Sequence, residues 1–145
     1  MEYCIYNAIK TPDGTILHCE HNHDYKTHED SITGETYMND GLGYYIRRSV
    51  NKISAQDLSV FDNDPYEKIR TIPFWGSYGK SGTEKKQILS LQEMTLEHIN
   101  AILDTQHHIK ENLIGELFQK ELRFREKLNL DESLNKKNKN KKVKL

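Results

Sequence analysis

The densest group of side chains that could do chemistry lies between residues 18 and 28. It contains four of the seven histidines and one of the two cysteines, namely His18, Cys19, His21, His23 and His28. Imidazole and thiolate are good zinc ligands, and His21 and His23 project from the same face of an extended segment. Cys4 is expected across a hairpin from His21, so three or four ligands could converge. The spacing matches no recognised zinc motif, which favours polar hairpin residues bonded to backbone or solvent, with no metal expected.

Missing motifs argue against three classes of enzyme. Cyclic-nucleotide hydrolysis by paired histidines needs Thr or Ser two positions after each histidine, and none of the seven histidines meets this condition. A serine triad on a nucleophile elbow needs Gly-x-Ser-x-Gly, which is absent. Gly79-Lys80-Ser81 resembles the end of a phosphate-binding P-loop, but Phe74 stands where that motif needs glycine. We expect a binding protein, not an enzyme. Near Lys80, a backbone anion nest and a plain hairpin loop both stay open.

A second group of candidates combines arginines with aromatic side chains. An arginine fork can hold a phosphate bidentately, and an aromatic ring can stack on a base. Arg125 lies about 20° from Phe118 around a helix, so it extends an apolar stripe where an unpaired charge is costly. Its partner is either a carboxylate or helix C-terminus, which would be structural, or the phosphate of a ligand. The candidate ligand-binding residues are Arg47, Arg48, Phe74, Trp75, Arg123 and Arg125.

The elements that must position these residues begin with two predicted β-hairpins. Thr11-Pro12-Asp13-Gly14 is a strong turn signal, because proline presets φ and glycine accepts positive φ. Residues 44–50 follow the Gly41-Leu42-Gly43 break and are too few for periodicity to separate helix from strand. The segments predicted to be extended are residues 2–10, 15–20, 24–28, 35–39, 57–61, 73–78 and 87–91.

Helices dominate the C-terminal third. Thr95 is expected to cap a helix over residues 96–104, and residues 109–128 form the clearest helical pattern. A shorter helix is expected over residues 66–70, with Asp64 as N-cap and Pro65 at the first helical position. The apolar stripe of the long helix consists of Leu113, Ile114, Leu117, Phe118 and Leu122.

The order of these elements predicts the α+β class, with a mostly antiparallel sheet of hairpins followed by two C-terminal helices. The length of 145 residues fits a single α+β domain over residues 1–130. Residues 131–145 are rich in lysine and asparagine and lack apolar spacing, so a disordered basic tail is expected. Its six lysines could attract nucleic acid, but the rest of the chain is acidic and no aromatics interleave. A solvated tail is therefore expected, not a nucleic-acid site.

Composition bounds the setting in which the protein works. Hydrophobic residues make up 35% of the chain and charged residues 30%, which indicates a lean core that association into oligomers would help. Two cysteines, with no basic and apolar leader, favour a cytosolic protein with reduced thiols. No run approaches the 18 apolar residues of a membrane span, so no membrane is expected as a partner.

Several segments together form a recognisable pattern. They are Asn7-Ala8-Ile9-Lys10-Thr11-Pro12-Asp13-Gly14-Thr15-Ile16-Leu17, His21-Asn22-His23-Asp24-Tyr25, Tyr37-Met38-Asn39-Asp40-Gly41, Arg47-Arg48-Ser49, Asp57-Leu58-Ser59-Val60, Asp64-Pro65, Trp75-Gly76, Thr95-Leu96-Glu97-His98-Ile99 and Ala101-Ile102-Leu103. The pattern resembles a family of small phage proteins and covers most of residues 5–127. Its characterised branch is the first type of Thoeris anti-defence protein.

This resemblance implies a phage-encoded sponge in the cytoplasm of the bacterial host. Such a sponge binds a cyclic ADP-ribose isomer (glycocyclic ADP-ribose) without cleaving it and so blocks Thoeris immunity. It implies no cofactor, and a homo-oligomer built from dimers whose C-terminal helices help to form the pockets. Phe74 or Trp75 would stack on the adenine, Arg123 and Arg125 would meet phosphates, and Arg47 or Arg48 would assist. One departure is Asn22, where relatives have arginine. Some relatives bind cyclic oligonucleotides at additional sites, and that function is not expected here if the arginine serves such a site.

Two other functions stay open on the residues alone. One is a zinc-binding protein or zinc-dependent enzyme that uses the histidines of residues 18–28 together with Cys4. The other is a phage accessory protein that binds nucleic acid through the lysines of the tail, with an affinity that falls steeply with salt.

Overall fold

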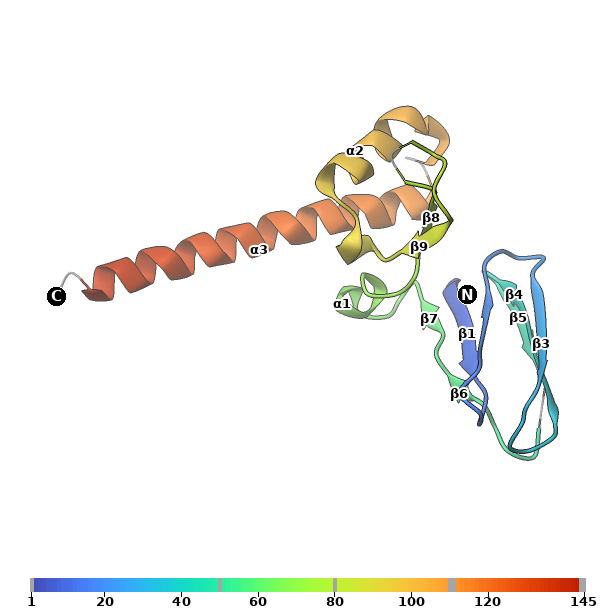
Figure 1. Ribbon diagram of the computed structural model, residues 1–145. Coiled ribbons are helices and arrows are strands. Elements are labelled where there is room, and N and C mark those ends of the chain that lie inside the picture. The colour runs from blue at the N-terminus through green and yellow to red at the C-terminus, as the bar shows by residue number, and fades with distance from the viewer. Residues whose placement is uncertain (1, 50, 80, 110–111, 144–145) are drawn as a thin grey trace. The chain divides into compact units, whose positions relative to one another are not determined.

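The N-terminal hairpin forms around the Thr11-Pro12-Asp13-Gly14 turn, as the sequence predicts. In the computed structural model, β1 (Cys4–Lys10) pairs antiparallel with β2 (Ile16–Cys19), and Gly14 has a φ of +91° (Figure 1). That positive φ is strained for any residue with a Cβ atom, so glycine closes the turn. The structure describes residues 2–49, 51–79, 81–109 and 112–143, and side chains are described as far as residue 129.

A second antiparallel sheet contains β3 (Tyr25–Glu29), β4 (Thr36–Leu42) and β5 (Tyr45–Arg48), with β4 in the centre. The segment 44–50, which the sequence left open between helix and strand, is therefore extended where it is described. Pairing across the tight turn decides this, because Leu42 lies opposite Tyr45 and Asn39 opposite Arg48. Gly43 makes the turn possible with a φ of +85°.

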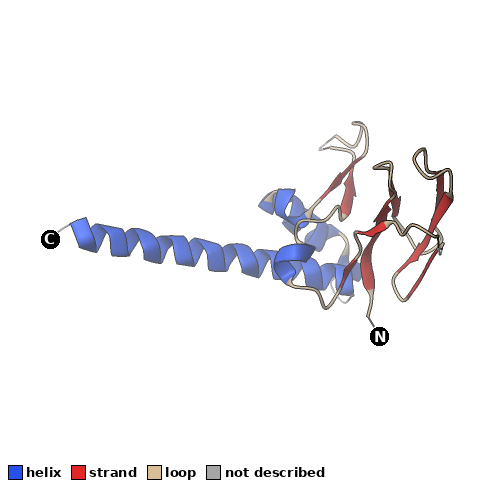
Figure 2. Ribbon diagram, turned by 90° about the horizontal axis from the view of Figure 1, so that it is seen from below, coloured by secondary structure: helices blue, strands red, loops and turns tan. Residues whose placement is uncertain are grey.

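Shorter elements complete the N-terminal part. The predicted strand at 57–61 forms as two short strands, β6 (Gln56–Asp57) and β7 (Val60–Phe61), which both pair with β1. A separate hairpin pairs β8 (Trp75–Ser77) with β9 (Gln87–Leu89). Every ladder among the described strands, which Figure 2 shows as red arrows, is antiparallel.

The short helix α1 (Tyr66–Ile69) begins at the expected residue, but its cap differs from the prediction of Asp64 as N-cap. Its N-cap is Pro65, and no side chain caps it. The carboxylate of Asp64 instead accepts a hydrogen bond from the backbone N–H of Phe61 at 2.9 Å. Asp64 therefore closes the turn after β7, and its carboxylate reaches the helix as the ion-pair partner of Lys68, at 3.7 Å.

The core of the N-terminal part lies between the β1–β2 hairpin and the β3–β4–β5 sheet. Burial alternates along β4, so Tyr37, Asn39 and Gly41 face inward. Tyr37 packs against Ile9 and Leu17 of the hairpin. The Asn39 amide donates to the backbone carbonyls of Asn7 at 3.2 Å and Leu17 at 2.9 Å, so the sheets are joined by buried hydrogen bonds as well as apolar contact.

The C-terminal part is helical. It contains η1 (Leu91–Glu93), α2 (Leu96–Thr105), η2 (His107–Ile109) and α3 (Leu113–Val143). Thr95 caps α2 as predicted, since its hydroxyl accepts from the N–H of His98 at 3.1 Å. The core of this part consists of Leu91, Met94, Ile99, Ile102, Leu103, Ile109, Leu117 and Phe118. The predicted stripe is thus correct at its centre, while Ile114 is 39% exposed.

These observations confirm the α+β class, with antiparallel hairpins first and helices last. The chain divides into two compact units between Ser90 and Leu91. The backbone of α3 is helical through Val143. No helix in the described ranges is long and apolar enough to cross a membrane.

We predict that Asn39→Ala destabilises the protein by about 2–3 kcal/mol. The change removes the amide that joins the two sheets and leaves the carbonyls of Asn7 and Leu17 short of a donor in a buried site. Urea denaturation of the full chain measures the effect. Asn63→Ala is the matched control, because Asn63 is exposed and its amide bonds only the exposed Glu2, and it should change stability by less than about 0.5 kcal/mol.

Candidate ligand-binding site

Three tyrosines contribute to the lining of a hollow in the first unit, which has a volume of 590 Å³. We call it the tyrosine hollow, and its lining residues are Tyr3, Glu20, His21, Asn22, Leu42, Gly43, Tyr44 and Tyr45. Tyr3 and Tyr44 stack edge to face, with ring centroids 5.0 Å apart and an angle of 88° between the rings. Tyr44 and Tyr45 are each 66% exposed, so their rings are accessible to a ligand.

Three turns and strand ends position the tyrosine hollow. The backbone of Cys4 at the start of β1 exchanges two hydrogen bonds with Gly43, at 2.9 and 3.0 Å. These bonds hold the β4–β5 turn against the N-terminus and place Tyr3 beside Tyr44. A Cβ atom at Gly43 would lie 3.1 Å from the ring of Tyr3, so glycine is needed both for the turn and for this close approach.

The opposite side of the tyrosine hollow is polar. Glu20, His21 and Asn22 lie in the turn between β2 and β3, where the carboxylate of Asp24 accepts from the backbone N–H of Glu20 at 2.9 Å. Lys86, the residue directly before β9, forms an ion pair with Glu20 at 3.1 Å. The hollow is therefore lined by aromatic rings, a carboxylate, an amide and an imidazole. An ammonium group lies nearby, paired with the carboxylate. Such a set can stack a planar ring and form hydrogen bonds to its substituents.

Arg47 and Arg48 point to opposite faces of β5, as the two-residue period of a strand requires. Arg47 lies on the outer face and donates to the Asp40 carboxylate at 3.0 and 3.2 Å. This hydrogen bond is the main reason that the pKa of Arg47 is raised. Arg48 lies on the inner face, where its guanidinium pairs with Asp57 at 3.0 Å and donates to Asn7 Oδ1 at 2.8 Å and to Ser59.

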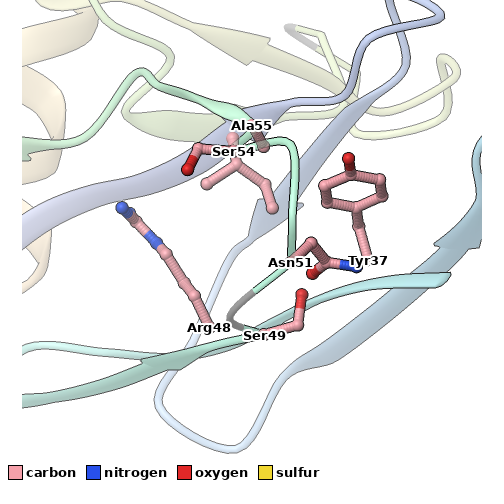
Figure 3. A pocket seen from close by; sticks show the side chains of 7 residues that line it. Tyr37, Arg48, Ser49, Asn51, Ser54 and Ala55 are labelled. Carbon is pink, nitrogen blue, oxygen red and sulfur yellow. The ribbon is translucent and has the colours of Figure 1, made fainter. Parts of the chain in front are cut away.

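Arg48 also lines a smaller cavity of 230 Å³, which we call the Arg48 cavity (Figure 3). Its other lining residues are Ile9, Tyr37, Ser49, Asn51, Ser54 and Ala55. Of the predicted ligand-binding residues, Arg48 is the one that lines a described cavity. The structure therefore places Arg48 beside a cavity, as a ligand-binding residue would be. Its positive charge is already compensated by the ion pair with Asp57.

The other predicted residues belong to two different units of the chain. Phe74 and Trp75 are half-buried at β8 of the first unit, where the N–H of Phe74 donates to the Leu89 carbonyl at 2.9 Å. Arg123 and Arg125 belong to α3 of the second unit. Arg123 is exposed, while the side chain of Arg125 is only 23% exposed.

The role assigned to Arg125 needs a correction. Its Nε donates to the fully buried carboxylate of Glu121 at 2.8 Å. A terminal nitrogen of the same guanidinium donates to the carbonyls of Leu91 at 2.8 Å and Met94 at 2.6 Å. The partner of this stripe arginine is therefore a carboxylate with two carbonyls, which is the structural alternative, and Arg125 fastens η1 to α3.

The histidines do not assemble with Cys4 as the zinc interpretation requires. Among the described residues, the one group of three or more potential metal ligands is Asp13, His28 and Asp30. His28 lies 2.7 Å from Asp13, and the Asp13 carboxylate also accepts from the hydroxyl of Thr11 at 2.6 Å. Asp30 accepts from the N–H of Asp13 at 2.7 Å. These carboxylates are occupied in closing two hairpin turns and tying them together.

The two thiols are buried and bond to backbone. Cys4 Sγ lies 3.3 Å from the carbonyl of Tyr6, and Cys19 Sγ lies 3.3 Å from that of Asn39. Burial raises the pKa of Cys4 to about 11 and also raises that of Cys19. A thiol with a raised pKa is a poor nucleophile at neutral pH, and both cysteines fill buried positions as small apolar side chains do. Lys80, considered above for an anion nest, lies outside the described residues.

Four lining residues, Tyr3, Tyr44, Tyr45 and Asn51, are not among the ligand-binding residues predicted from the sequence. Tyr44 and Tyr45 could have been identified, because they directly follow a Gly-Leu-Gly turn and adjacent side chains of a strand point to opposite faces. No such signal marks Tyr3 and Asn51, because their positions depend on pairings with residues about 40 and 15 positions away in the chain.

Comparison with known proteins does not supply a relative. No protein-family model matches the chain, and neither the curated proteins nor the solved structures that were searched gave a match.

We predict that Arg125→Met lowers stability by about 3 kcal/mol, because it leaves the buried Glu121 carboxylate without its arginine. Thermal and urea denaturation of the full chain measure the loss. Arg123→Met is the matched control on the same helix, and since Arg123 is exposed it should shift stability by less than about 0.5 kcal/mol. Unchanged stability together with lost ligand binding in Arg125→Met would contradict the structural role.

We also predict that Asp13 makes stability depend on acid pH. Hydrogen bonds from Thr11 and then His28 hold the pKa of Asp13 below its usual range. A carboxyl whose pKa is lowered by folding stabilises the fold above its unfolded pKa, near 4, and this contribution is lost as pH falls below that value. Asp13→Asn should therefore lower the melting temperature at pH 7. At pH 3, the difference in melting temperature between the variant and the wild type should be smaller. Glu29→Gln, an exposed carboxylate on β3, is the control and should show no such pattern.

Proposed function

We propose that this protein binds and sequesters a cyclic ADP-ribose isomer, glycocyclic ADP-ribose, without cleaving it. It would act in the cytoplasm of the bacterial host as a phage anti-defence protein and so block Thoeris immunity. The observation that carries the proposal is the tyrosine hollow, whose 590 Å³ falls within the range of nucleotide-sized ligand sites.

The chemistry of the tyrosine hollow suits a ligand of this class. Adenine has two accessible faces, and Tyr44 and Tyr45 present rings that can stack on it. Glu20, Asn22 and His21 supply acceptors and donors for the amino group, the ring nitrogens and the ribose hydroxyls. Lys86 contacts the lining through its ion pair with Glu20, and its ammonium group is suited to a phosphate.

The resemblance supports the same conclusion from another direction. The segment His21-Asn22-His23-Asp24-Tyr25, which carries part of the resemblance, supplies His21 to the lining of the tyrosine hollow and Tyr25 to the strand that follows. The roles suggested for Phe74, Trp75 and Arg123 belong to this proposal as well, as does assembly into a homo-oligomer built from dimers. Arg125 is assigned to structure instead, because its bonds to Glu121 and two carbonyls occupy it.

The decisive measurement is a calorimetric titration of the full chain with glycocyclic ADP-ribose. The complex is then heat-denatured, and chromatography determines whether the ligand is released intact. We expect saturable binding and full recovery of unchanged ligand. Absence of binding would contradict sequestration, and recovery of a degraded ligand would contradict a binding function without catalysis.

A matched pair of tyrosine variants tests the location. Tyr45→Ala should weaken binding by roughly 5- to 100-fold, because stacking of one base on an aromatic ring is worth about 1–3 kcal/mol. Tyr78→Ala is the control: Tyr78 is 52% exposed but lies at the β8–β9 hairpin and does not line the hollow. Both variants should keep the melting temperature of the wild type. Equal affinities in the two variants would show that the ligand binds elsewhere.

A further inference from the structure

The outer face of the β3–β4–β5 sheet presents aromatic and apolar side chains at the surface. Burial alternates along β4, so every second residue of this strand, with its cross-strand neighbours, points away from the core. We call this surface the outer sheet face, and its central residues are Tyr25, Thr27, Met38, Asp40, Leu42, Tyr45 and Arg47. Tyr25 is 56% exposed, Tyr45 is 66% exposed, and the side chain of Arg47 is 57% exposed. Tyrosine, methionine and arginine are enriched at the centre of protein–protein interfaces, so this composition fits a protein partner.

Two neighbouring rows of this face are complementary to themselves. Leu42 of β4 lies opposite Tyr45 of β5, and Asp40 lies opposite Arg47. A two-fold axis that runs along the strands, midway between β4 and β5, exchanges these two strands when a second copy lies face to face with the first. Asp40 of one copy then lies over Arg47 of the other, and Leu42 lies over Tyr45. An interface between identical subunits requires this reciprocity, and both rows provide it.

The charged row has capacity for contacts to a second copy. Both hydrogen bonds from Arg47 end on Asp40 Oδ2, at 3.0 and 3.2 Å, so Asp40 Oδ1 takes no part in them. A guanidinium carries several donors, and each carboxylate oxygen accepts more than one bond, so a second ion pair can form without breaking the first. Four alternating charges then form a network, which stabilises more than an isolated surface pair. A nucleic acid would instead need cations in excess, whereas Asp40 balances Arg47 here.

From this complementarity we infer that the outer sheet face is a contact surface between two copies of this chain. Arg47 of each copy pairs with Asp40 of the other, and Tyr45 of each copy packs on Leu42 of the other. Leu42 and Tyr45 also line the tyrosine hollow, so the second copy contributes a tyrosine beside that hollow. The inference rests on the assembly into dimers that the proposed function includes, and it does not depend on which ligand binds.

Analytical ultracentrifugation of the full chain without ligand, over a wide range of concentration, tests the surface. The wild type should form dimers as concentration rises. Arg47→Asp and Asp40→Arg should each weaken self-association by roughly 10- to 100-fold, because like charges then face each other between the copies. Lys26→Asp is the matched control: it makes the same change of charge as Arg47→Asp, but Lys26 lies opposite the inward-facing Asn39 and so on the other face of the sheet. Its self-association should equal that of the wild type.

Mixing the two charge variants separates a contact between copies from a role inside one copy. Each variant loses its internal ion pair, yet the mixture places the carboxylates of Arg47→Asp opposite the guanidinium groups of Asp40→Arg. Two proteins that associate weakly alone should therefore form heterodimers with an affinity near that of the wild type.

Three outcomes would overturn the inference: a wild type that stays monomeric, self-association unchanged in Arg47→Asp, or a mixture that forms no heterodimer. Melting temperatures establish that the variants are folded. Should a charge variant fail to fold, Tyr45→Ala takes its place, and unchanged self-association in that variant would also overturn the inference. A monomeric wild type would contradict the proposed dimers as well, whereas unchanged self-association would move the dimer contact elsewhere. Calorimetry with glycocyclic ADP-ribose tests the ligand separately.

Discussion

The first unit depends on side-chain amides buried between its two facing sheets. Asn39 donates to backbone carbonyls of both strands of the opposite hairpin, and Asn7 donates back to the carbonyl of Gly41 at 2.8 Å. Both asparagines are fully buried. Because a one-residue slip of β4 would move Asn39 to the outer face and leave those carbonyls unpaired, this exchange specifies the register of the central strand.

The register has consequences on both faces of the β3–β4–β5 sheet. On the inner face it places Arg48 beside Asn7, Asp57 and Ser59, so that a guanidinium is held between the sheets with its charge compensated. On the outer face it turns Arg47 toward Asp40. At the end of the sheet, the tight turn at Gly43 brings Tyr44 and Tyr45 to the surface next to Tyr3. The tyrosine hollow is thus a product of the same strand pairing that builds the core.

The segments that resemble the phage family have a shared structural role. Asn7, Asn39 and Arg48 belong to the buried network, and Asp13 closes the hairpin turns together with His28. The similarity is therefore concentrated where the fold needs particular polar groups. The residues that line the tyrosine hollow lie mostly outside these segments.

Local chemistry in the sequence was enough to predict the hairpins, the turn at Gly14, the cap at Thr95 and the α+β order, because each depends on neighbours within a few residues. It also identified arginines and histidines that could act on a ligand. Their partners came only from tertiary structure. Arg125 meets carbonyls 31 and 34 positions away, and His28 meets an aspartate 15 positions earlier. Since a charged or polar side chain has the same appearance in a sequence whether it binds a ligand or a buried carboxylate, only the packing of distant segments decides between the two.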